Sequence, residues 1–280
     1  MTDSGHDEGG ARLYIVSTPI GNLADMSERA VETLRSVSLV LAEDTRHSRR
    51  LMQHFGIPTP MEAYHEHNEA RATPRLLERL RNGESLALIS DAGTPLLSDP
   101  GGRLVRAAVD AGVQVVPVPG PSALLAALVA SGIDAGRFTY FGFLPRKGRE
   151  RLEAMEEIVD LRHTAVLFES PNRVAATLAE LAIHGAGGRE ASVAREMTKQ
   201  FEEVRRGTVG ELARYYEDAP PRGEVVIVLA GGRPSPLDEE ELRLRARELR
   251  EGGASARDVA RRLIVDYGAP RNIAYRVAHE

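Results

Sequence analysis

Short apolar runs and amphipathic helical patterns alternate along the first 120 residues, and this alternation restricts the fold more than any other feature. The apolar runs have the length of buried strands, and we expect strands at 13–16, 37–42, 86–89 and 113–118. We expect the intervening helices after the capping residue Ser27 and at 47–55, 74–81 and 103–111. This order is typical of β-α-β units, so the sequence predicts a mainly parallel sheet covered by helices.

A second series of elements starts near Tyr140. We expect strands at 164–168, 192–194 and 225–229 and a helix at 173–182. The segment 121–136 is interpreted as the join between two α/β units, with its helix at 124–129 packing on one of them.

These patterns together give a domain plan. The fold class is α/β, with two α/β domains at 12–120 and 121–232 and a small C-terminal helical appendage at 237–280. The appendage is expected to hold helices at 239–250, 256–266 and 272–278. Residues 1–11 are expected to form a disordered tail, and 231–236 (GGRPSP) has the composition of a linker.

Composition excludes several classes of protein. The 280 residues include no Cys, so disulfides, thiolate metal sites and a cysteine nucleophile are excluded. No apolar run reaches the roughly 18 residues of a membrane span, and the first ten residues lack the features of a secretion signal. A cytoplasmic protein is therefore expected. The net charge of −5 argues against wholesale coating of DNA or other nucleic acid, although it leaves room for a local basic face.

Four loops rich in Gly, Pro and small polar residues follow the expected strands of the first domain. They are STPIGN (17–22), AEDTRHS (42–48), SDAGTPLLSDPG (90–101) and PGPSA (119–123). In a parallel sheet such loops meet at one edge, where ligands bind. None of them matches a phosphate-binding G-x-x-x-x-G-K-[ST] or G-x-G-x-x-G pattern. The expected ligand is therefore a nucleoside-like cofactor without a polyphosphate.

Nine motifs occur in the order and spacing of one known family. They are LYIVSTPIGNL (13–23), AEDTRHS (42–48), YHEHNE (64–69), SDAGTPLLSDPG (90–101), VVPVPGPSA (115–123), FGFLPRKG (141–148), LFESPNR (167–173), AREMTK (194–199) and GEVVIVLAG (223–231). In these motifs the chain resembles the bacterial ribosomal RNA small-subunit methyltransferase I family, ribose 2′-O-methyltransferases with the tetrapyrrole methylase (class III methyltransferase) fold. The resemblance implies S-adenosylmethionine held between two α/β domains, a homodimer, and methylation of a cytidine ribose in the decoding region of 16S rRNA or the small ribosomal subunit.

The resemblance also implies a set of cofactor-binding residues. They are Pro19, Ile20, Gly21, Asp91, Gly93, Thr94, Pro95, Leu97, Ser122, Ala123 and Phe168. Tetrapyrrole methylases carry a Gly-Asp-Pro tripeptide where this chain has Gly93, Thr94 and Pro95. Because the acid is missing here, Asp91 is a substitute for it or an ordinary turn aspartate.

Methyl transfer to a ribose hydroxyl requires a group that removes the hydroxyl proton or a cation that favours its ionised form. Charged residues that follow the expected strands, or lie in the later motifs, are the candidates for this catalytic group: Glu43, Asp44, Arg46, Lys147, Glu169, Arg173, Arg195 and Glu196. Structural ion pairs among these arginines and glutamates are the alternative interpretation.

RNA binding is expected at PRKGRER (145–151), interpreted as a basic loop. Its candidate contacts are Arg146, Lys147, Arg149 and Arg151, and a merely solvated loop is the alternative. The arginine-rich appendage is a second candidate for RNA binding, although packing explains it equally well. Only 5% of the residues are aromatic, so stacking on RNA bases would depend on few side chains, such as Tyr140, Phe141 and Phe143. The alternative is that these three residues belong to the core of a strand.

A metal site is not expected. His65 and His67 are interpreted as alternating positions on one face of a strand, but no third ligand stands at a standard spacing. Two rivals remain for the function. One is a methylase that acts on a small tetrapyrrole, and the other is an RNA-binding or ribosome-assembly factor without catalysis.

Overall fold

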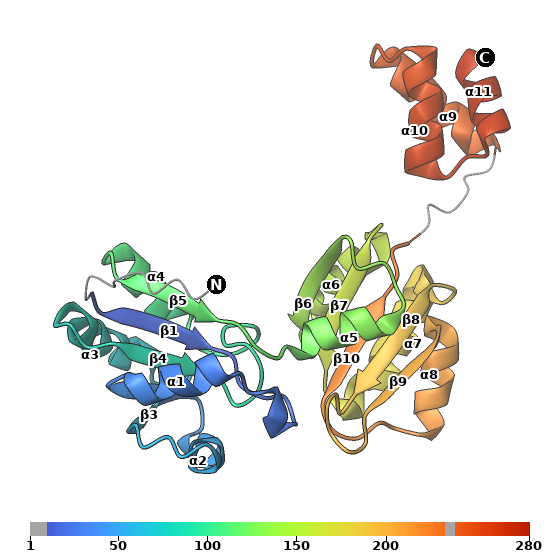
Figure 1. Cartoon of the computed structure of the whole chain (residues 1–280). Coiled ribbons are helices and arrows are strands. Elements are labelled where there is room, and N and C mark those ends of the chain that lie inside the picture. Colours follow the sequence, from blue (N-terminus) through green and yellow to red (C-terminus); the bar gives the residue numbers. More distant parts are fainter. Residues whose placement is uncertain (1–9, 233–238) are drawn as a thin grey trace.

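The computed structural model describes residues 10–232 and 239–280 (Figure 1). It contains two five-stranded sheets, each covered by helices, and a C-terminal segment of three helices. The expected α/β class with two sheets and a helical appendage is confirmed. The proposed tail lies mostly outside the described residues, and so do residues 233–236 of the proposed linker.

The first sheet has the strand order β3-β2-β4-β1-β5, and every pair of neighbouring strands is parallel. Its strands are β1 (Arg12–Val16), β2 (Leu39–Ala42), β3 (Met61–Ala63), β4 (Leu86–Ile89) and β5 (Gln114–Val118). Its helices are α1 (Glu28–Ser36), α2 (Thr45–His54), α3 (Glu69–Arg81) and α4 (Gly102–Asp110). The prediction of a parallel sheet is confirmed here.

Helices cover both faces of this sheet. Leu34 of α1 packs with Val40 and Ala87 on one face, and Leu76 of α3 packs with Leu88 on the other. Central strands that are buried on both faces read as continuous apolar runs, which is why β2 and β4 were recognisable in the sequence.

The parallel arrangement brings the four Gly- and Pro-rich loops to one edge. Each of them follows the carboxyl end of β1, β2, β4 or β5. The connection after β1 leads to β2, and the connection after the neighbouring strand β4 leads to β5, in the opposite direction across the sheet. A crevice therefore forms between the loops that follow β1 and β4. Thr18 and Gly93 bridge this crevice with two backbone hydrogen bonds of 2.9 and 3.0 Å.

The second sheet is mixed, with the order β6-β7-β10-β8-β9. Only β6 and β7 are parallel, and the other pairs are antiparallel. Its strands are β6 (Phe138–Phe143), β7 (Thr164–Glu169), β8 (Glu190–Arg195), β9 (Glu203–Thr208) and β10 (Val225–Leu229). The β-α-β pattern therefore does not extend through this sheet. Strand β9 escaped the sequence analysis because EVRRGT is too polar to read as a buried strand.

The helix α5 (Ala123–Ser131) follows the last loop of the first sheet but packs on the second. Its residues Leu124, Ala127 and Leu128 contact the face that holds Val226 and Val228, as expected for the joining segment. The opposite face is covered by α6 (Arg149–Asp160), α7 (Val174–Leu181) and α8 (Val209–Asp218). Short helical turns lie at η2 (Pro171–Arg173) and η3 (Ala182–Ala186) on either side of α7, and at η1 (Leu23–Asp25) before α1 of the first sheet.

Two local predictions were wrong. Strand β3 ends at Ala63, so His65 and His67 lie in the turn that precedes α3 and not on a strand. Helix α3 begins at Glu69 and not at Pro74. The side chain of Asn68 accepts a hydrogen bond from the His65 amide and donates to the Ala63 carbonyl, which fixes the turn and the start of the helix.

The C-terminal segment consists of α9 (Glu239–Glu251), α10 (Ala256–Tyr267) and α11 (Arg271–His279). It has a core of its own, in which Leu242, Leu263 and Val277 are buried. No helix of the described part of the chain is both long and apolar enough to span a membrane.

Candidate active site

A cavity of about 420 Å³ lies where the loop edge of the first sheet meets the second sheet. Loops after β1, β2, β4 and β5 line one side, and the ends of β6 and β7 with the start of β10 line the other. Its apolar lining comes from Ile20, Leu97, Phe143 and Phe168. The rings of Phe143 and Phe168 meet edge to face at 5.6 Å, and Phe143 is 54% exposed. An exposed aromatic side chain in a cavity offers a flat surface to a ligand.

The backbone approaches the cavity closely at Gly93. Its φ of +81° lies in the left-handed region, where side chains are strained. A Cβ atom there would also lie 3.2 Å from the Ile20 side chain. Gly93 thus allows the loops after β1 and β4 to meet at the cavity wall.

The loop at 94–101 holds strain and is tied to the second sheet. Leu96 and Ser98 have φ values of +75° and +68°, which are uncommon for residues with side chains. The Ser98 hydroxyl lies 2.7 Å from the Tyr140 hydroxyl of β6, so a hydrogen bond fastens this loop across the cavity. Strained backbone that the surroundings hold in place is frequent at functional sites.

Five carboxyl groups line the cavity, and three of them, Glu43, Asp91 and Asp99, come from the loops of the first sheet. Burial raises the pKa of Glu43 to about 7, and repulsion from Asp99 and Asp91 adds to the rise. Burial also raises the pKa of Asp99 to about 6, with Asp91 contributing. Asp91 accepts a hydrogen bond from the Asp44 amide at 3.1 Å, which connects the loops after β2 and β4. Near neutral pH, Glu43 can therefore both take up and release a proton.

The stability of the fold should depend on the ionisation of Glu43. Its pKa is about 7 in the folded chain against an ordinary 4.5, so the folded state binds the proton more tightly than the unfolded state. The resulting stabilisation is fully present below pH 4.5, the ordinary pKa of a glutamate, and is lost as the pH rises through about 7. Glu43→Gln should therefore raise the free energy of unfolding at pH 8 by about 1 kcal/mol, a value kept small because solvent screens the group. Calorimetric unfolding of the parent and the variant at pH 4 and pH 8 measures this change. An equal change in the free energy of unfolding at the two pH values would contradict the prediction.

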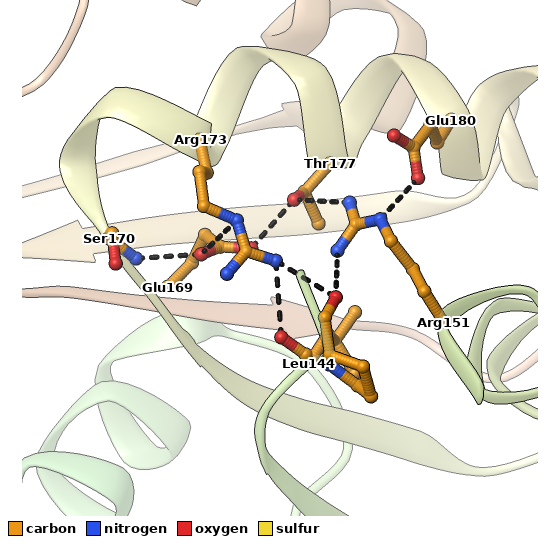
Figure 2. A network of polar contacts seen from close by, with 8 residues as sticks. Leu144, Arg151, Glu169, Ser170, Arg173, Thr177 and Glu180 are labelled. Carbon is orange, nitrogen blue, oxygen red and sulfur yellow. Dashed lines mark hydrogen bonds and ion pairs between the residues drawn. The ribbon is translucent and has the colours of Figure 1, made fainter. Parts of the chain in front are cut away.

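A polar network extends from Glu169, at the cavity wall, to residues behind that wall, and Figure 2 shows its contacts. Glu169, only 1% exposed, accepts hydrogen bonds from the Ser170 amide at 2.8 Å and from the Thr177 hydroxyl at 2.6 Å, and Arg173 Nε lies 3.4 Å from it. Arg151 Nη2 donates to the Thr177 hydroxyl at 3.0 Å. Arg151 and Arg173 both donate to the Pro145 carbonyl, at 3.0 and 3.3 Å, so the network also holds the start of the basic segment.

Thr177→Val should destabilise the chain by about 2 kcal/mol, because it removes hydrogen bonds to both Glu169 and Arg151 without changing the shape of the side chain. Urea unfolding measures the loss. Thr177→Ser keeps the hydroxyl and serves as the control. Equal stability of the valine and serine variants would show that these hydrogen bonds contribute little.

The structure brings most of the expected cofactor residues together. The main cavity is lined by Ile20, Asp91, Gly93, Thr94, Leu97, Ser122, Ala123 and Phe168. Pro19 and Gly21 line a neighbouring cavity that shares Ile20 and Asp91, and Pro95 lines neither.

The expected catalytic residues are more scattered. Glu43 and Glu169 line the cavity, and Glu169 also accepts hydrogen bonds from Ser170 and Thr177. Surface or loop ion pairs join Arg46 to Asp44, Arg195 to Glu203 and Glu196 to Lys199. Arg173 belongs to the network behind the wall. Arg173 and Glu169 form a pair of the kind that the ion-pair alternative describes, whereas Arg46, Arg195 and Glu196 pair with other residues, so the catalytic role of this group stays a prediction.

The basic segment divides into two parts. Arg146, Lys147 and Arg149 are exposed, and Arg149 pairs with Glu153 at 2.6 Å. Arg151 instead lies in α6, is 7% exposed, and donates to Pro145, Thr177 and Glu180. The prediction of an RNA contact at Arg151 is wrong, because its guanidinium is buried and already bonded.

Sequence reasoning missed Asp99 and Glu224, which line the cavity, and did not assign Phe143 to it. Asp99 stands in the loop motif at 90–101, so an inventory of every acid in the four loops would have found it. Glu224 precedes β10 in the motif at 223–231, outside the four loops from which a ligand site was expected.

The His65 and His67 rings lie 5.9 Å apart in the turn before α3. Within residues 10–232 and 239–280, no group of three or more metal-binding side chains has a geometry suited to a metal ion.

Comparisons with known proteins identify the family. A model of the tetrapyrrole (corrin/porphyrin) methylases matches residues 12–213. A protein of Synechocystis named ribosomal RNA small subunit methyltransferase I is 43% identical over 271 residues, which cover 96% of this chain and 97% of that protein. The Bacillus subtilis protein of the same name is 40% identical and covers 95% of this chain and 94% of its own length. The chain belongs to the ribosomal RNA small subunit methyltransferase I group of the tetrapyrrole methylases.

Solved structures of the tetrapyrrole methylase fold resemble the two sheets. The methyltransferase CobJ has a TM-score of 0.60 at 17% identity and covers 80% of this chain and 95% of its own. Uroporphyrin-III C-methyltransferase from Thermus thermophilus, solved with S-adenosylhomocysteine, has a TM-score of 0.57 at 19% identity and covers 79% of this chain and 97% of its own. At these identities the likeness carries the fold alone.

Proposed function

We propose that this chain transfers a methyl group from S-adenosylmethionine to the 2′-hydroxyl of a cytidine ribose in the decoding region of 16S rRNA. The names of the relatives and the family support a methyltransferase that acts on small-subunit rRNA. The single observation that carries the chemistry is the cavity between the sheets, which combines aromatic walls with a carboxyl group of pKa about 7.

The residues of the cavity fit S-adenosylmethionine. A volume of about 420 Å³ suits a ligand of nucleoside size. The adenine base would lie among Phe143, Phe168 and Leu97, which are apolar. The carboxylates of Asp91 and Asp99 complement a positively charged sulfonium group. When bound, this cofactor supplies a methyl group already activated by its sulfonium sulfur.

The chain itself must orient the ribose hydroxyl and remove its proton. Glu43 lies at the end of β2 and lines the cavity, and a carboxylate with a pKa near the working pH is an efficient general base. In our mechanism an Oε atom of Glu43 would accept the proton of the ribose hydroxyl, while the cofactor would supply the methyl group and its sulfur would keep the electron pair of the broken S–CH3 bond. The exposed Arg146 and Lys147 bind phosphates and bring the target nucleotide to the cavity.

We also propose that the chain works in the cytoplasm as a homodimer. Leu125 and Val129 of α5 are 51% and 75% exposed and stand one helical turn apart, as expected for part of a subunit contact. Sedimentation equilibrium should give twice the chain mass.

Mass mapping of ribose methylation in 16S rRNA, from cells with and without this protein, tests the function. We expect one cytidine 2′-O-methyl group to disappear without the protein and to return when purified protein and S-adenosylmethionine are added. A chain that binds S-adenosylmethionine in calorimetry but methylates no RNA would favour the small-molecule alternative. Absence of cofactor binding would favour the assembly factor.

A further inference from the structure

A groove between α10 and α11 carries arginines on both of its sides. Its volume is about 660 Å³. Arg257 and Arg261 of α10 line one side, and Arg271 and Tyr275 of α11 line the other. Each pair is separated by one helical turn, so its two side chains lie on the same helix face. Val265, one turn beyond Arg261 on α10, is 65% exposed and adds an apolar surface to that side.

Part of the positive charge in the helical segment is balanced by ion pairs away from this groove. Ion pairs join Arg243 and Arg276 to Glu239, and Arg245 to Glu248. In the described part of the chain, by contrast, no carboxylate lies within 4.0 Å of the groove arginines Arg257, Arg261 and Arg271.

One acid, Asp258, also lines the groove and offsets part of the positive charge without forming an ion pair with these arginines. It accepts a hydrogen bond from Ser255 at the start of α10. The groove therefore carries three arginines against one carboxylate, which leaves it with a net positive charge.

The chemistry of the groove fits a nucleic acid strand. Guanidinium groups form paired hydrogen bonds with phosphates. The Tyr275 ring is 41% exposed, and Arg271 Cζ lies 5.9 Å from its centre, so ring and cation together offer a stacking surface for a base. We propose that this groove binds a single-stranded segment of RNA, with the three arginines at successive phosphates and Tyr275 against a base.

The comparisons favour RNA as the occupant over an acidic protein. The corrin and porphyrin methylase model ends at residue 213, before the helical segment begins. The Synechocystis relative, whose name refers to ribosomal RNA, matches 96% of this chain, which requires most of that segment to be included. This proposal rests on the proposed function, because it gives the same RNA substrate a second contact outside the cavity.

The test compares the full chain with the triple variant Arg257→Ala/Arg261→Ala/Arg271→Ala. Filter binding to a labelled, protein-free 16S rRNA fragment from the decoding region measures Kd between 50 and 300 mM salt. We expect Kd to rise about tenfold and the slope of log K against log salt to fall by about 2, because three phosphate contacts are lost. Arg262→Ala is the matched control, since Arg262 is exposed on the same helix but does not line the groove. Tyr275→Ala should weaken binding more than Tyr275→Phe.

Calorimetric binding of S-adenosylmethionine and thermal unfolding should be unchanged in the triple variant, because exposed arginines contribute little to stability. If the parent methylates RNA and the triple variant keeps the parent's Kd and salt slope, the groove proposal alone is overturned. A parent that neither binds nor methylates RNA would overturn the proposed function as well. Weaker binding to 30S subunits without weaker binding to the protein-free fragment would instead assign the groove to a ribosomal protein.

Discussion

Glu43→Gln should lower kcat about 100-fold or more, because general bases commonly contribute that much and a neutral amide cannot accept the ribose proton. The affinity for S-adenosylmethionine should change less than about threefold, since the amide keeps the size of the carboxyl group. Single-turnover methylation of 16S rRNA measures the rate, and calorimetry measures the affinity.

The pH dependence of the same reaction gives a second readout. Because the ionised form of Glu43 acts as the base and burial raises its pKa to about 7, kcat in the parent should rise with pH and level off above that value. The variant should lose this rise. Glu78→Gln, the same change at an exposed position of α3, is the control and should leave the profile unchanged. A Glu43→Gln variant with parental kcat would remove Glu43 from the mechanism.

Thr94→Trp should weaken binding of S-adenosylmethionine about 100-fold or more. The Thr94 hydroxyl lies 3.1 Å from the Ser17 hydroxyl and 3.3 Å from the Pro121 carbonyl, so the side chain stands where three of the loops meet at the cavity. An indole there would occupy much of a space of about 420 Å³. Calorimetry with S-adenosylmethionine measures the loss.

Thr94→Val is the matched control for this substitution. It keeps the volume of the side chain and removes only the hydroxyl, so the affinity should fall less than about tenfold. Thermal unfolding of both variants separates a blocked cavity from a damaged fold. Parental affinity in a folded Thr94→Trp protein would place the cofactor elsewhere.

The parallel sheet and its loop edge were predictable because their signals are local. Strands buried on both faces give apolar runs such as Leu86–Ile89, and the loops that follow them carry Gly, Pro and acidic residues in recognisable order. The edge strand β9 gave no such signal, since its charged side chains reach solvent or ion pairs, as Arg205 does with Glu203.

Residue roles within the site were less accessible to sequence analysis. Arg149 and Arg151 stand two residues apart in one basic run. Arg151 is buried against α7 and bonded to it, whereas Arg149 is exposed to solvent. That difference depends on Glu180 and Thr177, which are distant in sequence. The raised pKa of Glu43 likewise arises from burial and from Asp99 and Asp91, carried by another loop. Such effects follow from tertiary packing and are not encoded in neighbouring residues.

The short connection at 119–122 links the two sheets through the cavity wall, because Ser122 both lines the cavity and caps α5, which is anchored on the second sheet. A molecule lodged there touches loops of the first sheet and strand ends of the second sheet at once. Its binding energy then stabilises both sheets. Saturating the cavity with this ligand should therefore merge the melting of the two sheets into one cooperative transition and protect the amides of both from hydrogen exchange.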